Sequence, residues 1–200
     1  MTFSPVEAID VASAAPPGLW CFAGPPGSGK STLGRAVAAR VGACMLDLDT
    51  ATNPLIAHIA ALTGAGDDLD HPSLRGAVRS ARYRCLTDLA AENVRVGRSV
   101  VLVAPFTREG ADAEAWQQLA HAMSPAVPFL IWVDVPPAVA LQRRQQRRLA
   151  RDRTASLLTG HELGAEFPRP VVDHLLANGA APTEVEAERL AGLLGGPGTH

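Results

Sequence analysis

The sequence predicts an α/β fold in which a parallel sheet carries helices on both faces. Apolar, strand-like runs alternate with helical segments along most of the chain, which is the pattern of such sheets. The run 19–23, and the run 100–104 that follows Ser99, are apolar without interruption, as expected of strands that are buried on both faces. A glycine-rich turn over 24–29 joins the first run to a helical segment, so the sheet begins with a strand–loop–helix unit.

Composition limits the class of protein. A chain of 200 residues with 47% apolar residues is long enough for one domain with a substantial core. The net charge of −2 argues against a protein that coats nucleic acid. Cys21, Cys44 and Cys85 show no paired spacing, and we expect free thiols in a reducing compartment. We find no secretory signal and no apolar run of ~20 residues, so we expect a cytoplasmic protein without membrane spans.

Residues 1–18 are expected to form an extension before the domain. Ser4 as a cap predicts a short helix over 4–14, and the Pro-Pro-Gly sequence at 16–18 ends it. The apolar run 19–23 then predicts the first strand.

The next elements follow the glycine-rich turn. Helix-forming residues over 32–41 predict a helix, and Cys44–Asp49, an apolar run that ends in two acids, predicts the second strand. A helix is expected over 52–62, with Thr52 or Asn53 as its cap.

A long amphipathic helix is predicted over 72–96, because apolar residues recur there at helical spacing. The residues of this stripe are Leu74, Val78, Ala81, Cys85 and Leu89. Helices and strands then alternate to the end of the domain at residue 194. The expected strands are 99–104, 128–134 and 174–177, the expected helices are 111–123, 136–153 and 183–194, and residues 195–200 are expected to be a loose tail.

The strongest motif is the pattern G-x-x-x-x-G-K-S/T, which fits at every fixed position. Its residues are Gly24, Pro25, Pro26, Gly27, Ser28, Gly29, Lys30, Ser31 and Thr32. Glycines let backbone N–H groups approach a phosphate closely, and the N-terminus of the following helix favours an anion. The motif assigns Lys30 to the β- and γ-phosphates and Ser31 to Mg²⁺. Lys30 is also the only lysine among the 18 lysines and arginines, as expected where a compact charge is required.

Two acids, Asp47 and Asp49, are expected at the carboxyl end of the second strand, where open α/β sheets bind their ligands. In a strand this spacing puts both carboxylates on one face. One acid can then hold Mg²⁺, and the other can accept the proton of an attacking hydroxyl. The alternative is that Asp49 caps the next helix.

Arginines crowd the segment after the fourth strand. They are Arg143, Arg144, Arg147, Arg148, Arg151 and Arg153. On a helix, positions 144, 148 and 151 share one face and positions 143, 147 and 151 a neighbouring one. Like charges at this spacing repel each other, and a bound anion would relieve the repulsion. The alternatives are a solvated face or a patch for nucleic acid, but no aromatic residue alternates with the arginines to stack on bases.

The ends of the third and fourth strands carry further candidates. Thr107 and Arg108 follow the third strand and face the substrate side, unless they belong to a solvated loop. Asp134 ends the fourth strand and is an alternative metal ligand. The third strand ends without an acid and without a glutamate to activate water, which favours group transfer over hydrolysis.

Four stretches in this order resemble the small P-loop kinases, such as shikimate kinase, gluconate kinase, chloramphenicol phosphotransferase and the kinase domain of polynucleotide kinase. They are Gly24–Thr32, Asp47–Asp49, Val100–Arg108 and Val133–Asp152, and the resemblance covers residues 19–194. It implies a P-loop NTPase fold with an AAA-type ATP-binding domain. This fold is a three-layer sandwich with a five-stranded parallel sheet in the order 2-3-1-4-5 and an arginine-rich lid.

The resemblance also implies roles for residues. ATP would donate its γ-phosphoryl group to a hydroxyl of a small molecule, with Asp49 as base and substrate anchor and Asp47 beside Mg²⁺. Lid arginines would close over the phosphates, with Arg144 and Arg148 first and Arg151 next, although the register 143 and 147 fits equally well. Acceptor contacts are expected from the long helix, or else these residues are surface arginines: Arg75, Arg79 and Arg82. The stretch Ala177–Pro182 resembles the loop that holds adenine.

Two other functions stay open at this level. The acceptor of the phosphoryl group can be a nucleic-acid 5′-hydroxyl or a nucleotide sugar instead of a metabolite. The chain can also be a nucleotide-dependent switch that performs no transfer. Neither the acceptor nor the oligomeric state follows from the sequence.

Overall fold

The computed structural model describes residues 16–63, 72–147 and 168–194, and it confirms the predicted fold class and strand order. Five parallel strands form one sheet in the order β2-β3-β1-β4-β5. The strands are β1 Leu19–Ala23, β2 Cys44–Asp47, β3 Val100–Val103, β4 Pro128–Asp134 and β5 His174–Asn178. The helices are α1 Lys30–Val41, α2 Leu48–Thr63, α3 Pro72–Arg95, α4 Thr107–Ala111, α5 Ala113–Ala122, α6 Pro137–Arg147 and α9 Thr183–Leu194.

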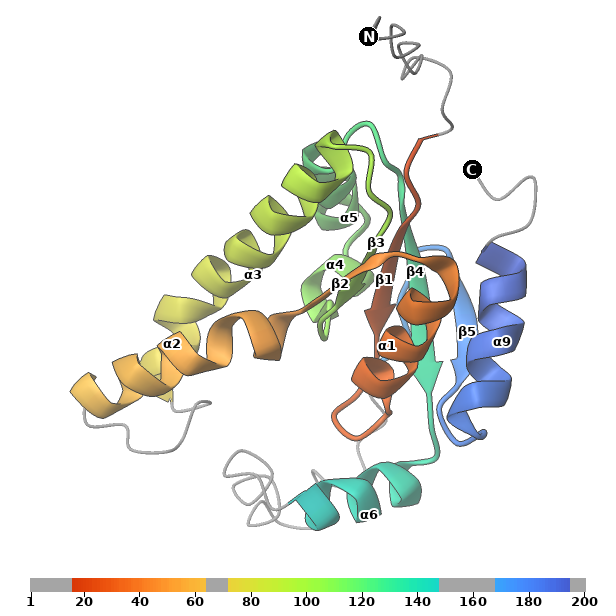
Figure 1. Ribbon diagram of the computed structural model, residues 1–200. Helices are drawn as coiled ribbons and strands as arrows, with labels where there is room; N and C mark the ends of the chain where they lie inside the picture. The colour runs from red at the N-terminus through yellow and green to blue at the C-terminus, as the bar shows by residue number, and fades with distance from the viewer. Residues whose placement is uncertain (1–15, 64–71, 148–167, 195–200) are drawn as a thin grey trace, which may run out of the picture.

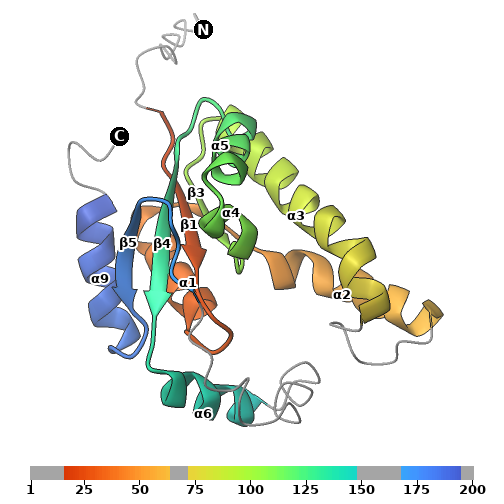
Figure 2. The same cartoon turned by 180° about the vertical axis from the view of Figure 1, so that it is seen from behind.

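Helices cover both faces of the sheet, as Figures 1 and 2 show from opposite sides. Helices α1 and α9 pack on one face, and α3 and α5 pack on the other. Because the strands are parallel, their carboxyl ends meet at one edge, which is the lower edge in Figure 1 and faces α6. This edge is where ligands of open α/β sheets bind.

The alternation of side chains along the central strand explains the two cores. Cys21 points into the cluster with α3 and α5, and its neighbour Phe22 points into the cluster with α1 and α9. Every residue of β1 is buried, so the strand that leads into the glycine-rich loop is fixed from both sides. The three cysteines carry free thiols, and burial raises the pKa of the Cys21 thiol far above its usual value.

The second strand is shorter than predicted. It ends at Asp47, and α2 begins at Leu48, so Asp49 lies in the first turn of a helix and not in the strand. The cause is a cap: Oδ1 of Asp47 accepts hydrogen bonds from the backbone N–H groups of Asp49 at 2.9 Å and Thr50 at 3.1 Å. The predicted caps, Thr52 and Asn53, are therefore wrong.

The other differences are local. The segment predicted as a loop and one helix forms α4 and α5 instead, because Asp112 adopts an extended backbone and caps α5 through the N–H of Glu114. On α3 the stripe that faces the sheet is Leu86, Ala90 and Val94, whereas the predicted member Leu89 is 37% exposed. The helical spacing of the stripe was predicted correctly, but the residues that face the sheet lie one position later in the sequence than predicted.

Some predictions lie outside the described residues: the helix 4–14, the part of the arginine-rich helix beyond Arg147, and the tail 195–200. Among the helices that are described, none has the length and apolar character to cross a membrane.

Candidate active site

The glycine-rich loop forms a tight cradle at the end of β1. The N–H of Ser28 donates to the carbonyl of Pro25 at 3.1 Å, which folds the loop back on itself. Gly29 is the N-cap of α1 with φ 93°, a left-handed conformation that favours glycine. The first turn of α1 therefore presents its N–H groups to the loop, with Lys30, Ser31 and Thr32 at its start. The ammonium of Lys30 lies 3.4 Å from the carbonyl of Pro25.

Helix α6 packs against the loop. A Cβ on Gly27 would lie 2.4 Å from the carbonyl oxygen of Ala140, in a backbone conformation with φ 86°. Since real Cβ atoms do not approach backbone that closely, only glycine lets the loop and α6 meet here. Ser28 beside it is fully buried. These features fit a phosphate cradle whose walls are backbone rather than side chains.

A cavity of about 220 Å³ lies between the loop and the turn after β5. Its lining includes Gly29, Thr32, Asn178 and Gly179, so the stretch that resembles an adenine loop lies beside the glycine-rich loop. Nη1 of Arg143 donates to the carbonyl of Gly179 at 2.8 Å and to that of Ser28 at 3.3 Å, and it bridges the two walls.

Of the two arginine registers, the structure brings Arg143 into hydrogen-bond contact with the loop at Ser28. Adjacent residues on a helix point about 100° apart, so Arg143 and Arg144 lie on different sides of the loop. Arg144 lines a second cavity of about 930 Å³ beside Pro25 and Pro26, and its Nε is buried without a hydrogen-bond partner. Arg148 and Arg151 lie outside the described residues.

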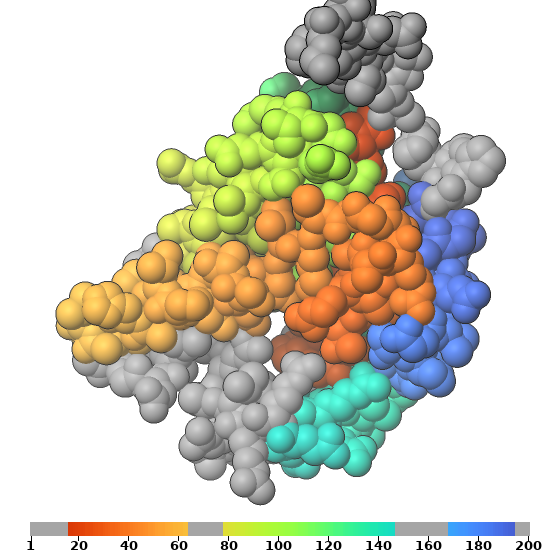
Figure 3. Space-filling view, in the orientation of Figure 1, coloured from red at the N-terminus to blue at the C-terminus, as the bar shows by residue number. Residues whose placement is uncertain are grey.

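The two acids at the end of β2 have different surroundings. Asp47 is only 8% exposed, and its Oδ1 caps α2. The Asp49 side chain is 41% exposed and forms an ion pair with Arg82, 2.9 Å between Oδ1 and Nη2. The expectation that a strand aligns both carboxylates is therefore wrong, because β2 ends at Asp47 and Asp49 lies in the first turn of α2. The surface is hollowed between α2, the glycine-rich loop and α6 (Figure 3).

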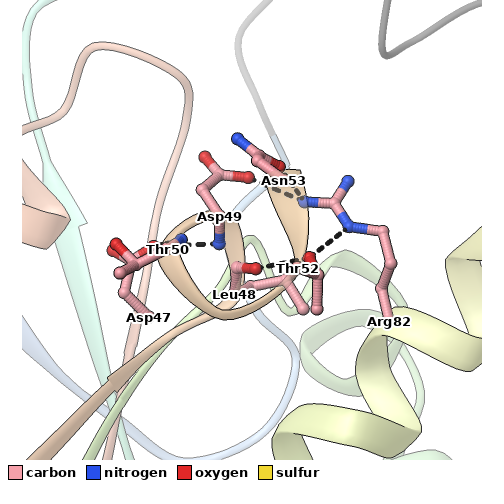
Figure 4. Close-up of polar contacts among 7 residues, drawn as sticks. All are labelled: Asp47, Leu48, Asp49, Thr50, Thr52, Asn53 and Arg82. Atoms are coloured by element: carbon pink, nitrogen blue, oxygen red, sulfur yellow. Dashed lines mark hydrogen bonds and ion pairs between the residues drawn. The ribbon is translucent and has the colours of Figure 1, made fainter. Parts of the chain in front are cut away.

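Arg82 contacts two further oxygens of α2, as Figure 4 shows. Its Nε donates to Oγ1 of Thr52 at 2.8 Å, and its Nη2 also donates to Oδ1 of Asn53 at 2.8 Å. The hydroxyl of Thr52 in turn donates to the carbonyl of Leu48 at 2.6 Å. Arg82, which was predicted to bind the phosphoryl acceptor, thus contacts Asp49, which was predicted to be the base.

A third group lies where β3 passes into α4. Phe106 is buried with φ 45°, and its N–H donates to the hydroxyl of Tyr83 at 3.0 Å. The guanidinium of Arg79 lies over the Tyr83 ring, 4.8 Å from its centroid, and Nη2 donates to Oγ1 of Thr107 at 3.0 Å. Burial, with a further contribution from Glu109, outweighs the influence of Arg79 and raises the pKa of Tyr83 to about 12.

The other predicted residues are scattered around this edge. Arg108 is exposed in α4, and Arg75 belongs to α3. Asp134, the alternative metal ligand, pairs with Arg169 at 3.0 Å and lines the larger cavity. Among the residues placed by the structure, no three histidines, cysteines or acids gather as a metal cluster.

Sequence reasoning missed Thr52 and Asn53 as parts of the site. A signal was present: Asp49, Thr52 and Asn53 stand at positions i, i+3 and i+4, which share one face of a helix. The error in the strand boundary hid it, since the same residues do not share a face in a strand.

Comparison with known proteins gives one family and several related folds. A family of AAA domains (AAA_33) matches residues 19–166. No curated protein sequence matches the chain. Among solved structures, a kinase candidate from Chloroflexus aurantiacus is 20% identical with TM-score 0.65, and the match covers 89% of this chain and 93% of that one. The APS kinase of Mycobacterium tuberculosis, solved with AMPPNP and APS, is 20% identical with TM-score 0.60, and the match covers 91% of this chain and 100% of that one. A gluconokinase from Sinorhizobium meliloti is 20% identical with TM-score 0.53, and the match covers 90% of this chain and 97% of that one. The chain therefore has the fold of the small P-loop kinases.

Proposed function

Since this chain belongs to the AAA_33 family of AAA domains, we propose that it is a kinase that transfers the γ-phosphoryl group of ATP to a hydroxyl of a small molecule. The observation that carries the proposal is the meeting of two groups at one edge of the sheet. The glycine-rich loop follows β1, and the partly exposed carboxylate of Asp49 follows β2. A phosphate cradle and a base at the same edge are the parts that transfer to an alcohol requires.

The donor side of this proposal rests on the loop. Backbone N–H groups at the start of α1, together with Lys30, would hold the β- and γ-phosphates. The turn at Asn178 and Gly179, bridged to the loop by Arg143, would hold the adenine ring of ATP. Ser31 and Asp47 would hold Mg²⁺, since both offer the oxygen atoms that this ion prefers. When bound, the ion would neutralise charge on the transferring phosphates.

The acceptor side rests on Asp49. Its carboxylate would accept the proton of the acceptor hydroxyl while that oxygen forms a bond to the γ-phosphorus. The bond between the γ-phosphorus and the bridging oxygen breaks, ADP leaves, and Asp49 later returns the proton to solvent. Thr107 and Arg79, which are joined by a hydrogen bond, would line the acceptor site from the side of β3 and α3.

The test is a panel of hydroxyl-bearing compounds, namely sugars, polyols, nucleosides, antibiotics and short oligonucleotides, incubated with ATP and Mg²⁺. We expect one small-molecule class to raise ADP release above the acceptor-free rate. Asp49→Asn should lower this transfer at least about 100-fold, because it removes the base while the side chain keeps its size. The Kd of an ATP analogue, measured by calorimetry, should stay within about twofold of its wild-type value.

A matched control is available on α3. Asp88 is an exposed acid that lies 3.9 Å from Arg84, and Asp88→Asn should leave transfer unchanged. Stimulation by oligonucleotides alone would favour the nucleic-acid kinase, and ATP binding without any stimulated turnover would favour a switch. Full transfer by Asp49→Asn would refute the role of this residue as the base.

A further inference from the structure

We propose that Arg82 is a positioning residue that holds the carboxylate of Asp49 in place, and not a ligand of the acceptor. The inference rests on the proposed function, in which Asp49 is the base. It reverses the expectation from the sequence, where Arg82 was grouped with residues that bind the substrate.

The contacts of Arg82 point to this role. Arg82 donates three hydrogen bonds, at 2.8 to 2.9 Å, to side-chain oxygens of α2 (Figure 4). The acceptors are one oxygen each of Asp49, Thr52 and Asn53. Two of the acceptors share Nη2, so the carboxylate and the Asn53 amide are held around one nitrogen. A guanidinium presents its donors in a planar fork, and this geometry fixes the direction of each acceptor.

Burial supports the same conclusion. The Arg82 side chain is 15% exposed, whereas that of Asp49 is 41% exposed. The cation therefore lies behind the carboxylate, packed between α2 and α3, and the anion lies nearer the solvent. A residue that receives an acidic substrate group would be expected to have the opposite exposure.

The target of Arg82 is itself rigid. Asp47 caps the first turn of α2, and Thr52 donates to the carbonyl of Leu48, so the backbone on both sides of Asp49 is fixed by hydrogen bonds. The remaining freedom of Asp49 is the rotation of its side chain, which Arg82 restricts. Loss of such support displaces a reacting group by fractions of an ångström to an ångström, which lowers turnover more than binding.

Arg79, one turn earlier on the same helix, makes a useful contrast. It is exposed, and it contacts Tyr83 and Thr107 instead of α2. The two arginines, which looked equivalent in the sequence, serve different sides of the cleft. Arg82 supports the base, and Arg79 is the one that faces outward.

The experiment is a double-mutant cycle of Asp49→Asn and Arg82→Gln, with the acceptor found in the panel. Arg82→Gln alone should lower kcat about 10- to 100-fold and change the acceptor KM by less than about threefold. Arg82→Lys should give a similar loss, because an ammonium cannot reproduce the planar fork. Added to Asp49→Asn, Arg82→Gln should cause no further loss, since a residue that acts through Asp49 has nothing left to orient.

The control is Arg84→Gln, which removes an arginine of the same helix that is 84% exposed and should leave kcat unchanged. Losses that multiply in the double mutant, or a rise in acceptor KM with unchanged kcat, would overturn the proposal and make Arg82 a substrate ligand. Side-chain mobility of Asn53, followed by NMR relaxation of its amide group, supplies a readout that needs no acceptor. The order parameter of this group should fall in Arg82→Gln and stay at its wild-type value in Arg84→Gln if Arg82 holds the side chains of this turn. An unchanged order parameter in Arg82→Gln overturns the proposal, while a wild-type protein that transfers to nothing refutes the proposed function instead.

Discussion

Replacing Gly27 by alanine tests whether the glycine-rich loop is locked by its packing under α6. Two costs are expected. Alanine at φ 86° is in the left-handed region, which costs about 1–2 kcal/mol for a residue with a Cβ. The new Cβ would also lie 2.4 Å from the carbonyl oxygen of Ala140, and such overpacking costs about 1–3 kcal/mol. Gly27→Ala should therefore lower the free energy of unfolding by about 2–5 kcal/mol.

Gly42 supplies the matched control. It caps the end of α1 with φ 68°, and apart from its two chain neighbours no residue comes within 4 Å of the position that a Cβ would take. Gly42→Ala should show the conformational cost alone, about 1–2 kcal/mol. The effect of alanine on the unfolded chain is similar at both positions, so the difference between the variants isolates the steric contact.

The assay is urea unfolding of wild type and both variants, followed by the binding of a non-hydrolysable ATP analogue. Gly27→Ala should be less stable than Gly42→Ala by at least about 1 kcal/mol, and it should lose nucleotide affinity because the loop or α6 must shift. Gly42→Ala should bind the analogue as the wild type does. Equal stability of the two variants, together with equal nucleotide affinity, would refute the steric argument.

Two further predictions concern Asp47 and Tyr83. Asp47→Ala should lower the free energy of unfolding by about 1 kcal/mol, because α2 loses its cap, whereas Asp47→Asn keeps a capping oxygen and should be nearly as stable as wild type. If Asp47 also holds Mg²⁺, Asp47→Asn will still weaken magnesium-dependent turnover; unchanged turnover in both variants would limit the residue to a cap. Tyr83 is the only tyrosine in the chain, so its ultraviolet titration can be followed directly, with a midpoint near pH 12 in the folded protein and near pH 10 in urea. Because the folded pKa is the higher one, stability should be complete below about pH 10 and decrease as the pH rises towards 12; a folded-state midpoint near 10 would contradict the burial of this hydroxyl.

The outcome for the fold shows which patterns are reliable. Uninterrupted apolar runs such as 100–104 located strands, because a strand of a parallel sheet is buried on both faces. Boundaries were less reliable where a polar side chain could hydrogen-bond to the backbone. Asp47 ended β2 two residues early, and Asp112 set the start of α5 at Ala113, after a short helix where a loop was expected. In each case a carboxylate that captures N–H groups decided the boundary, and the apolar pattern carries no record of it.

The sequence by itself determined the class of sheet, the order of helices and strands along the chain and the position of the glycine-rich loop. These are local properties: apolar periodicity and the glycine, lysine and serine of one continuous motif fix them within a few residues of chain. Only the tertiary structure decided which arginine meets which partner. Arg82 of α3 reaches Asp49 of α2, and Arg143 rather than Arg144 donates a hydrogen bond to Ser28 of the loop. Both contacts depend on the rotation of a helix about its axis. Side chains of adjacent residues on a helix point about 100° apart, so the rotation of the helix decides which of two neighbouring arginines makes a given contact. Packing against the sheet, and not sequence spacing, sets that rotation.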